Sequence, residues 1–304
     1  MSGPGTKILL LGASGQLGQA FLELSKTDAF PIGWILTPLD REQVDYSFSE
    51  PVEARVRLEK PNLILNCAAY TAVDRAESER DLANQVNGQI PYLLARIAKD
   101  LSIPLIHYSS DYVYAGSGVQ PHLETESLAP LNHYGRSKAL GDEGIQAAGC
   151  DYLIFRTSWV YSHIGNNFVR TMLRVSKERS ELRIVNDQIG APTYAPDLAK
   201  YSLQALMCAL EMKAAGRAFP NGVYHLANAG EVSWAGFARA ILPGKSIVGI
   251  SSSDYPTPAK RPLNSRLDLN KFQSTFGIRP RNWEVALEEC LQCLRLREDQ
   301  DLHG

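Results

Sequence analysis

Short apolar runs alternate with longer amphipathic stretches through the first half of the chain. The runs are rich in Leu, Ile and Val without strict polar alternation, which is typical of strands buried on both faces of a sheet. They occupy residues 7–11, 34–37, 63–67, 105–108 and 153–157. The stretches between them have the length of helices, as at 16–26 and 79–100.

This alternation predicts an α/β fold with a parallel, doubly wound sheet of the Rossmann type. We therefore expect a dinucleotide-binding domain over residues 1–161. Pro91 lies inside the helical stretch 79–100, where its missing N–H and its ring disfavour a continuous helix. The pattern predicts a kink or a break near that proline.

The pattern changes after about residue 160. It predicts a helix over 166–182, a strand over 183–188 and a second helix over 196–215. The later loops are long and contain proline, and long loops beside an α/β sheet usually belong to a binding site. We expect a smaller, substrate-binding domain over 162–304, interleaved with the first because the segment around 190–215 returns to it.

Composition narrows the class of protein. The 304 residues are 44% hydrophobic and 21% charged, with a net charge of −2, as in an ordinary globular protein. This charge lacks the basic footprint of nucleic-acid binding, and no apolar run is long enough to span a bilayer. The N-terminus has no signal-peptide pattern, so we expect a cytoplasmic protein without a membrane partner. Residues 1–5 are expected to form a flexible lead and 297–304 a frayed tail.

The five cysteines, an odd number spread thinly, fit a reducing compartment. Cys290 and Cys293 form a C-x-x-C pair, but a zinc site would need a second ligand pair, and none is nearby. The six histidines show no metal spacing, and His107 is expected to pack in the core. We therefore predict no metal, and a core-facing helical stripe instead: Trp283, Leu287, Cys290, Leu291 and Leu294.

The stretch "KILLLGASGQLGQAF" places three glycines between an apolar strand and a helix. Gly12, Gly15 and Gly18 allow a tight turn and a close approach of backbone to a ligand. The N-terminus of the following helix offers free N–H groups and a positive dipole to a pyrophosphate. In this context the turn predicts a dinucleotide site, although the glycine pattern alone would be weak.

The second strand ends near Asp40, 22 residues after Gly18, where an acidic residue commonly meets the adenosine ribose. A carboxylate there favours a free 2′-hydroxyl and hence NADH. Its neighbour Arg41 suits a 2′-phosphate and hence NADPH. The sequence leaves both cofactors open.

Tyr134 and Lys138 stand four residues apart in "YGRSK", so on a helix they share one face. A tyrosine with its ordinary pKa near 10 is a poor acid–base catalyst at neutral pH. A nearby ammonium is expected to lower that pKa and to let the phenol give its proton to a developing alkoxide.

Two further segments follow predicted strands directly, at the sheet edge where open α/β folds bind ligands. Ser110 and Asp111 follow the fourth strand, and the Ser110 hydroxyl is suited to a hydrogen bond with a substrate carbonyl. Small residues at 67–69 follow the third strand and leave room for a flat cofactor.

The motifs together resemble the dTDP-4-dehydrorhamnose reductases, a family of the extended short-chain dehydrogenase/reductases. The likeness runs from Lys7 to about Leu294 in the family's order. The glycine turn and the Tyr-x-x-x-Lys pair occur across the wider superfamily and imply only a nicotinamide oxidoreductase. Narrower motifs carry the substrate: "RTSWVY", "NDQIGAPT" and "YPTPAKRP".

The resemblance implies reduction of the 4-keto group of dTDP-4-dehydro-6-deoxy-L-mannose to dTDP-L-rhamnose, with NADPH or NADH as cofactor. It implies Tyr134 as proton donor, Lys138 as its partner, and Ser110 where many members have threonine. The expected cofactor-binding residues are Gly12, Gly15, Gln16, Leu17, Gly18, Asp40, Arg41, Asp45, Tyr46, Ala68, Ala69, Tyr70, Thr71, Tyr108, Tyr134 and Lys138. The expected substrate-binding residues are Ser110, Asp111, Trp159, Arg261 and Asn264.

The chain departs from the family pattern at two places. Tyr114 and Ala115 replace a more usual Phe–Asp. Pro196 stands where some relatives have an acidic residue, which argues against a metal-linked contact between two copies. A homodimer is one option for the assembly.

Two other functions stay open at the level of sequence. The first is a reductase or an epimerase that acts on another nucleotide sugar. The second is a regulatory subunit that binds a nicotinamide cofactor and contacts another protein without catalysis. The nucleotide base of the sugar is also open.

Overall fold

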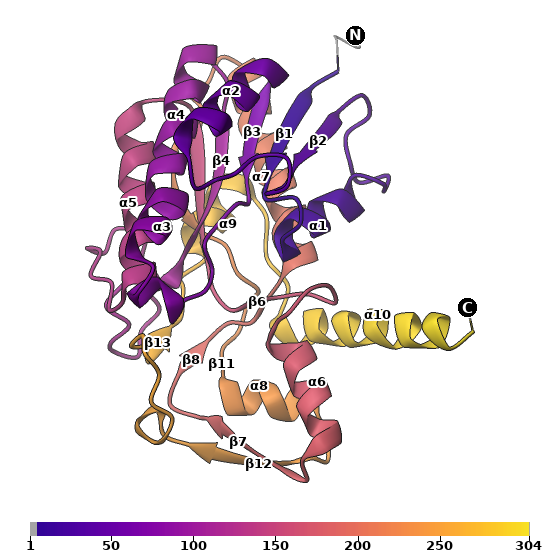
Figure 1. Cartoon of the computed structure of the whole chain (residues 1–304). Helices are drawn as coiled ribbons and strands as arrows, with labels where there is room; N and C mark the ends of the chain where they lie inside the picture. The colour runs from indigo at the N-terminus through magenta and orange to yellow at the C-terminus, as the bar shows by residue number, and fades with distance from the viewer. Residues whose placement is uncertain (1–4, 304) are drawn as a thin grey trace.

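The computed structural model describes residues 5–303 and has a six-stranded parallel sheet at its centre (Figure 1). Every strand pairs in parallel with its neighbour, in the order β10-β5-β4-β3-β1-β2. The strands are β1 (Lys7–Leu11), β2 (Ile35–Leu39), β3 (Leu63–Asn66), β4 (Leu105–Ser110), β5 (Tyr152–Thr157) and β10 (Gly222–His225).

Helices cover both faces of this sheet, so the predicted α/β, Rossmann-type fold is confirmed (Figure 1). One apolar core lies between the sheet and α1 (Gln16–Leu24), α7 (Ala195–Ala214) and α9 (Asn270–Phe276). The other lies between the sheet and α2 (Ser49–Glu59), α4 (Ile90–Leu101) and α5 (His133–Ala148). The inner strands β3 and β4 are buried along their whole length, as the lack of strict polar alternation in these segments predicted.

The helical stretch 79–100 is divided, as predicted from Pro91. It consists of α3 (Arg80–Asn84), a π-helical turn over Gln85–Gln89, and α4 with Pro91 in its first turn. Pro91 has no N–H for the Asn87 carbonyl four residues earlier. A Cβ on Gly141 of α5 would lie 2.2 Å from that carbonyl oxygen, so glycine lets α5 approach the opened turn closely.

A second, smaller unit follows the sheet and has its own core (Figure 1). Its strands pair as β11-β8-β13, β12-β7 and β6-β9. The bounds are β6 (Val160–Tyr161), β7 (Glu181–Val185), β8 (Ile189–Gly190), β9 (Thr193–Tyr194), β11 (Val232–Ser233), β12 (Ser246–Ile250) and β13 (Asn264–Ser265). The helices are α6 (Phe168–Glu178), α8 (Trp234–Ile241) and α10 (Trp283–His303).

The chain passes more than once between the sheet and this smaller unit. Helix α7 packs against α1, and β10 pairs with β5 at the edge of the central sheet. The domain limits 1–161 and 162–304 stay a prediction. We propose that α7 and β10 belong with the sheet, because their apolar side chains lie in its cores.

The C-terminal helix α10 packs along the stripe that the sequence predicted. Trp283, Leu287 and Cys290 are buried in the core of the smaller unit, with Leu291 and Leu294 partly buried beside them. The prediction of a frayed tail is wrong as far as His303, because α10 continues to that residue. Of the predicted flexible lead, residues 1–4 lie outside the described part of the chain.

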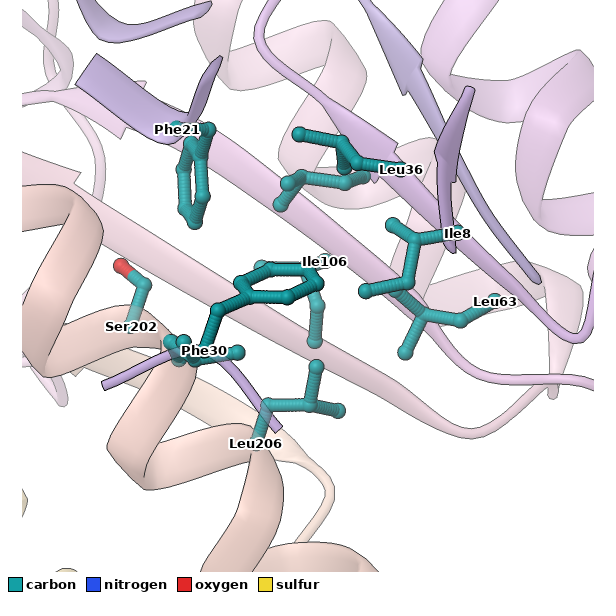
Figure 2. A pocket seen from close by; sticks show the side chains of 10 residues that line it. Ile8, Phe21, Phe30, Leu36, Leu63, Ile106, Ser202 and Leu206 are labelled. Carbon is teal, nitrogen blue, oxygen red and sulfur yellow. The ribbon is translucent and has the colours of Figure 1, made fainter. Parts of the chain in front are cut away.

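A cavity of about 10 Å³ lies under the sheet, between β strands and α7 (Figure 2). Its walls are apolar side chains with the single hydroxyl of Ser202. This space is no larger than a water molecule requires, so it is a packing defect rather than a ligand site. Within residues 5–303, no helix combines the length and the apolar character that crossing a membrane would need.

Candidate active site

The glycine turn after β1 is shaped by two glycines that no other residue replaces without strain. Gly12 has φ +77°, and a Cβ there would lie 2.5 Å from the backbone nitrogen of Ala68. A Cβ on Gly18 would lie 2.3 Å from the carbonyl oxygen of Gly12. Gly15 is the N-cap of α1, and no side chain caps that helix. The first turn of α1 therefore presents its N–H groups to a ligand.

A pocket of about 330 Å³, the first pocket, opens where β1, β2 and β3 end. Nine of the sixteen predicted cofactor residues line it: Gly12, Gly15, Arg41, Asp45, Tyr46, Ala68, Ala69, Tyr70 and Thr71. Tyr46 braces the turn, because its hydroxyl accepts from the Gly12 N–H at 3.1 Å and donates to the Leu39 carbonyl at 3.0 Å. The first pocket thus lies at the edge where doubly wound sheets bind dinucleotides.

Other predicted cofactor residues lie around this pocket without lining it. The carboxylate of Asp40 accepts N–H groups from Glu42 and Gln43 at 3.0 and 3.1 Å, so it caps its own turn. The side-chain oxygen of Gln16 accepts from Asn167 at 3.0 Å, which ties the glycine turn to the loop before α6. Leu17 packs against the core with α7, and Gly18 lies under the turn.

The predicted role of Tyr108 needs a correction. Its ring is buried under the sheet, with its centroid 6.4 Å from that of Phe21 and 5.9 Å from that of Phe155. The side chain therefore faces away from the first pocket, because alternate residues of a strand point to opposite faces. What Tyr108 supplies is its carbonyl oxygen, which accepts a hydrogen bond from the Lys138 ammonium at 2.6 Å.

Tyr134 and Lys138 share one face of α5, as their spacing predicted. Asn132 caps this helix by accepting the Gly135 N–H at 2.8 Å. Lys138 is 1% exposed, and burial lowers the pKa of its ammonium to about 8. The side chain points between the ends of β3 and β4, where Cys67 lies in the wall of the first pocket.

Groups other than Lys138 shift the pKa of Tyr134. Burial raises the pKa of Tyr134 to about 12, and Ser110 is the one group that lowers it. The Lys138 ammonium is bound to the Tyr108 carbonyl instead. Tyr134 also contacts the ring of Tyr112, edge to face, with centroids 5.5 Å apart.

Ser110 and Asp111 form a buried pair at the end of β4. The Ser110 hydroxyl donates to Asp111 Oδ1 at 2.9 Å and accepts the Tyr112 N–H at 3.1 Å. Burial raises the pKa of Asp111 to about 6, while the nearby Ser265 and the hydrogen bond from Ser110 oppose that rise. Ser110 lowers the pKa of Tyr134, and Tyr112, whose N–H binds the Ser110 hydroxyl, contacts the Tyr134 ring, so the two predicted catalytic residues are neighbours.

A second pocket, of about 500 Å³, adjoins this pair through Tyr112. The segment 67–74 borders both pockets, because its first part lines the first pocket and Asp74 lines the second. Arg261 also lines the second pocket, and its Nη2 lies 2.8 Å from Asp74 Oδ2. The wall from the smaller unit includes Phe168, Met172, Arg183, Gln188, Trp234 and Tyr255.

Two predicted substrate residues stand beside the second pocket rather than in its wall. Trp159 has φ +47° and stacks on Trp234 with centroids 3.7 Å apart, so it backs an aromatic side chain of the wall. Asn264 is 1% exposed and donates to the carbonyls of Ser117 and Gln120, at 3.3 and 2.7 Å. Its amide holds the loop after β4 and does not face the pocket.

Several residues of the site carry no signal in the sequence. Asn87, in the π-helical turn, accepts the Tyr70 N–H at 2.8 Å and donates to the Tyr70 carbonyl at 3.0 Å. Arg183 and Trp234 come from segments with no local motif and are brought to the second pocket by packing. Tyr112 follows Ser110 and Asp111 directly, so its position in the loop after β4 was the one available hint.

The family model that matches this chain is described as the RmlD substrate binding domain, and the match spans residues 6–296. The chain is 43% identical over 300 residues to a dTDP-4-dehydrorhamnose reductase of Burkholderia thailandensis, covering 95% of this chain and 99% of the relative. It is 41% identical over 298 residues to one of Escherichia coli K12, covering 93% and 96%.

A solved structure shares both fold and sequence with this chain. It is the dTDP-4-dehydrorhamnose reductase of Bacillus anthracis in complex with NADP, with a TM-score of 0.83 and 33% identity. The likeness covers 94% of this chain and 99% of that one. The chain therefore belongs to the dTDP-4-dehydrorhamnose reductase family.

Proposed function

We propose that this protein reduces the 4-keto group of dTDP-4-dehydro-6-deoxy-L-mannose to give dTDP-L-rhamnose, with NADPH or NADH as reductant. The observation that carries the proposal is that Tyr134 and Lys138 share one face of α5, with the Tyr134 ring against Tyr112 of the second pocket and the Lys138 ammonium bound to the Tyr108 carbonyl. The relatives of matching length carry the name of this activity.

The first pocket fits a nicotinamide dinucleotide. A turn that tolerates no Cβ at Gly12 or Gly18 leads into an uncapped helix N-terminus, which suits a pyrophosphate. Arg41 and Asp45 line the end of the pocket near β2 and would hold the adenosine. When bound, the reduced nicotinamide supplies the hydride.

The chain's own residues supply the proton and the stabilisation of charge on oxygen. With its pKa raised to about 12, the Tyr134 phenol is a weaker acid than a free tyrosine, but it keeps its proton near neutral pH and can still donate it to an alkoxide, which is a stronger base than the phenolate. To hydrogen-bond the substrate oxygen, the Ser110 hydroxyl would turn its single proton away from Asp111 Oδ1, to which it now donates. The Lys138 ammonium uses one donor on the Tyr108 carbonyl and keeps two for a ribose hydroxyl.

The second pocket suits a nucleotide diphosphate sugar. Arg183 and Arg261 offer two guanidinium groups, which match phosphate oxygens, and Trp234 offers a flat aromatic face for a base. Tyr112 joins this pocket to Tyr134. The sugar end of a ligand would then lie at the catalytic hydroxyl groups.

The direct test incubates purified protein with the dTDP-keto-sugar and either NADPH or NADH, and follows nicotinamide oxidation and the sugar product. Net oxidation with formation of dTDP-L-rhamnose is expected. Tight nicotinamide without net consumption would instead indicate an epimerase. If the protein reduced a different nucleotide sugar and not the dTDP-keto-sugar, the proposed substrate would be wrong.

Tyr134→Phe separates an enzyme from a regulatory subunit. Loss of the phenolic proton is expected to lower kcat about a hundredfold or more, while cofactor affinity stays within about twofold, because the ring is retained. Cofactor binding is measured by nicotinamide fluorescence, and Tyr92→Phe on the exposed side of α4 serves as the matched control. Unchanged turnover in Tyr134→Phe would contradict the assignment.

Location and assembly belong to the same proposal. All five cysteines are free thiols, which supports a reducing, cytoplasmic environment. A homodimer stays a prediction that light scattering on the purified protein would test.

A further inference from the structure

Asp142 lies one helical turn after Lys138 on α5, so Tyr134, Lys138 and Asp142 follow one another on a single helix face. The Asp142 side chain is completely buried. A carboxylate in such a place is costly unless a cation or hydrogen-bond donors accompany it. Its direct partner is Arg156 on β5, whose Nε donates to Oδ2 at 2.9 Å.

Arg156 begins a chain of buried hydrogen bonds that runs to the edge strand β10. Its Nη1 donates to the Tyr114 hydroxyl oxygen at 2.7 Å, and that oxygen lies 2.6 Å from His225 Nε2. His225 Nδ1 lies 3.0 Å from the carbonyl oxygen of Asp268. A carbonyl can only accept, so Nδ1 carries the ring proton, and Nε2 accepts from Tyr114. Each hydrogen bond in this series then has a defined donor and a defined acceptor.

The groups that face Lys138 come from neighbouring strands as well as from α5. Its ammonium donates to the Tyr108 carbonyl and lies 3.5 Å from His107 Nε2. Asn66 Oδ1 accepts the Ala68 N–H, so the Asn66 amide nitrogen donates to His107 Nδ1 at 3.0 Å. The ring proton of His107 is therefore on Nε2, which offers the ammonium no acceptor.

Asp142 is the only carboxylate, within the described part of the chain, that raises the pKa of Lys138. Burial lowers that pKa to about 8, with Asp142 and then Cys67 acting against it. Burial also raises the pKa of Cys67 well above its usual value, so that thiol carries no charge near neutral pH. Burial and the Lys138 charge lower the pKa of His107, which stays neutral as well.

We propose that Asp142 is a positioning residue, whose buried carboxylate keeps Lys138 charged on the helix face that carries Tyr134, and that Arg156, Tyr114 and His225 hold this carboxylate in place. The inference deepens the proposed function, on which the catalytic use of Lys138 rests. It also gives Tyr114 a role, since a phenylalanine at this position would leave Arg156 Nη1 and His225 Nε2 without their shared partner.

The first test is an NMR titration of the lysine Nζ resonances in the ligand-free protein, with the Lys138 signal assigned through Lys138→Arg. In Asp142→Asn the Lys138 midpoint is expected to fall by at least about one pH unit, a tenfold loss of proton affinity. In Tyr114→Phe, which keeps the carboxylate, it should fall by much less. Asp151→Asn, which removes a partly exposed carboxylate paired with Lys213, is the matched control and should leave it unchanged.

The second test is the pH dependence of kcat in the same variants. The activity of the wild type should be lost as pH rises through the pKa of Lys138, and in Asp142→Asn this loss should occur at a lower pH. A variant that is less stable but keeps the wild-type alkaline limb and Lys138 midpoint would overturn the proposal.

The two tests separate the inference from the proposed function. The NMR titration needs neither cofactor nor substrate, so a shifted midpoint supports the role of Asp142 even in a protein that fails to reduce the keto-sugar. Conversely, normal turnover with an unshifted midpoint rejects the role of Asp142 alone.

Discussion

Two buried groups of the active site hold protons that exposed groups would hold less tightly. Burial raises the pKa of Tyr134 to about 12 and that of Asp111 to about 6. A phenol that keeps its proton suits a reductase, which must protonate an alkoxide. Ionising a buried carboxyl group above its pKa lowers the free energy of unfolding. Asp111 therefore destabilises the protein near pH 7, although it accepts a hydrogen bond from the Ser110 hydroxyl.

Asp111→Asn should make the protein more stable near pH 7. The pKa of Asp111 is higher in the folded protein than its ordinary value of 3.8, so its contribution to stability is full below about pH 4 and is lost as pH rises to about 6. A shift of about two units corresponds to about 3 kcal/mol, an upper estimate because the amide changes the hydrogen bonds. Urea unfolding of the variant and the wild type at about pH 4 and about pH 7 measures this difference in stability.

The expected result is a gain of about 1 to 3 kcal/mol over the wild type near pH 7 and little difference near pH 4. Asp45→Asn, at a more exposed carboxylate of the first pocket, is the control. A difference in stability between Asp111→Asn and the wild type that is the same at about pH 4 and about pH 7 would show that the pKa of Asp111 is not raised by folding.

At the scale of elements, the glycines of the turn after β1 differ in the structural reason for having no side chain. Gly18 lets α1 pack under the turn, since a Cβ would lie 2.3 Å from the Gly12 carbonyl oxygen. Gly15 is different, because a Cβ there meets only one atom of the chain within 4 Å, at 3.4 Å, and the residue lines the first pocket. Packing of the protein therefore does not require glycine at position 15, and we propose that this space serves the cofactor.

Gly15→Ala and Gly18→Ala should consequently have different effects. In Gly15→Ala the melting temperature should stay near that of the wild type, while nicotinamide affinity falls about tenfold or more, equal to about 1.4 kcal/mol. In Gly18→Ala the clash with backbone should cost about 1 to 3 kcal/mol of stability as well as affinity. Thermal unfolding and fluorescence titration measure both quantities, and equal affinity of Gly15→Ala and wild type would contradict the site.

Pairs of elements also position the wall of the first pocket. Pro91 has no N–H to donate to the Asn87 carbonyl in the π-helical turn. Because residue 141 is glycine, α5 can approach this carbonyl closely. The Asn87 side chain then reaches both the Tyr70 backbone and the Ser137 hydroxyl, at 2.9 Å. The irregular helix therefore links the segment that borders both pockets to α5, the helix that carries the proposed catalytic pair Tyr134 and Lys138.

At the scale of the whole molecule, a small set of polar contacts joins the sheet to the C-terminal segments. Asp197 on α7 accepts from Arg281 Nε and from Asn228 Nδ2, both at 2.7 Å. Arg281 also pairs with Glu289 on α10 at 2.7 Å. One guanidinium thereby fixes α10 relative to a helix that packs on the sheet.

Arg281→Ala should lower stability without a direct effect on chemistry. The substitution removes the cation that pairs with the Asp197 carboxylate, which is only 7% exposed. Breaking a fully buried pair costs about 3 to 5 kcal/mol, so about 2 kcal/mol is expected for this partly exposed arginine. Denaturant unfolding checks the loss, with Arg217→Ala in the loop after α7 as control, and kcat of the remaining folded protein should match the wild type.

The sequence predicted the local features of this protein well. Strand β1 has the predicted bounds, and β4 continues two residues further, to Ser110. The break near Pro91 was predicted, but its π-helical form and the close approach of Gly141 from another helix were not. Most predicted cofactor residues line the first pocket, because they follow parallel strands that end at one edge.

The partners of individual side chains were less predictable. Asp40 follows the strand at the expected distance, yet its carboxylate caps the next turn. Lys138 was expected to lower the pKa of Tyr134 and instead binds a carbonyl on β4. Asn264 comes from the expected loop but supports another loop. In each case a competing hydrogen-bond partner, invisible in the local pattern, determines where the polar group points.

The sequence alone determined the α/β class, the glycine turn and the shared helix face of Tyr134 and Lys138, since periodicity and backbone sterics act over a few residues. Only the tertiary structure decided the second pocket and the buried pair of Asp142 with Arg156. The distant segments that carry Arg183, Trp234 and Arg156 meet only when the cores close. Burial and electrostatic pairing arise from that closure, so they cannot be read from spacing along the chain.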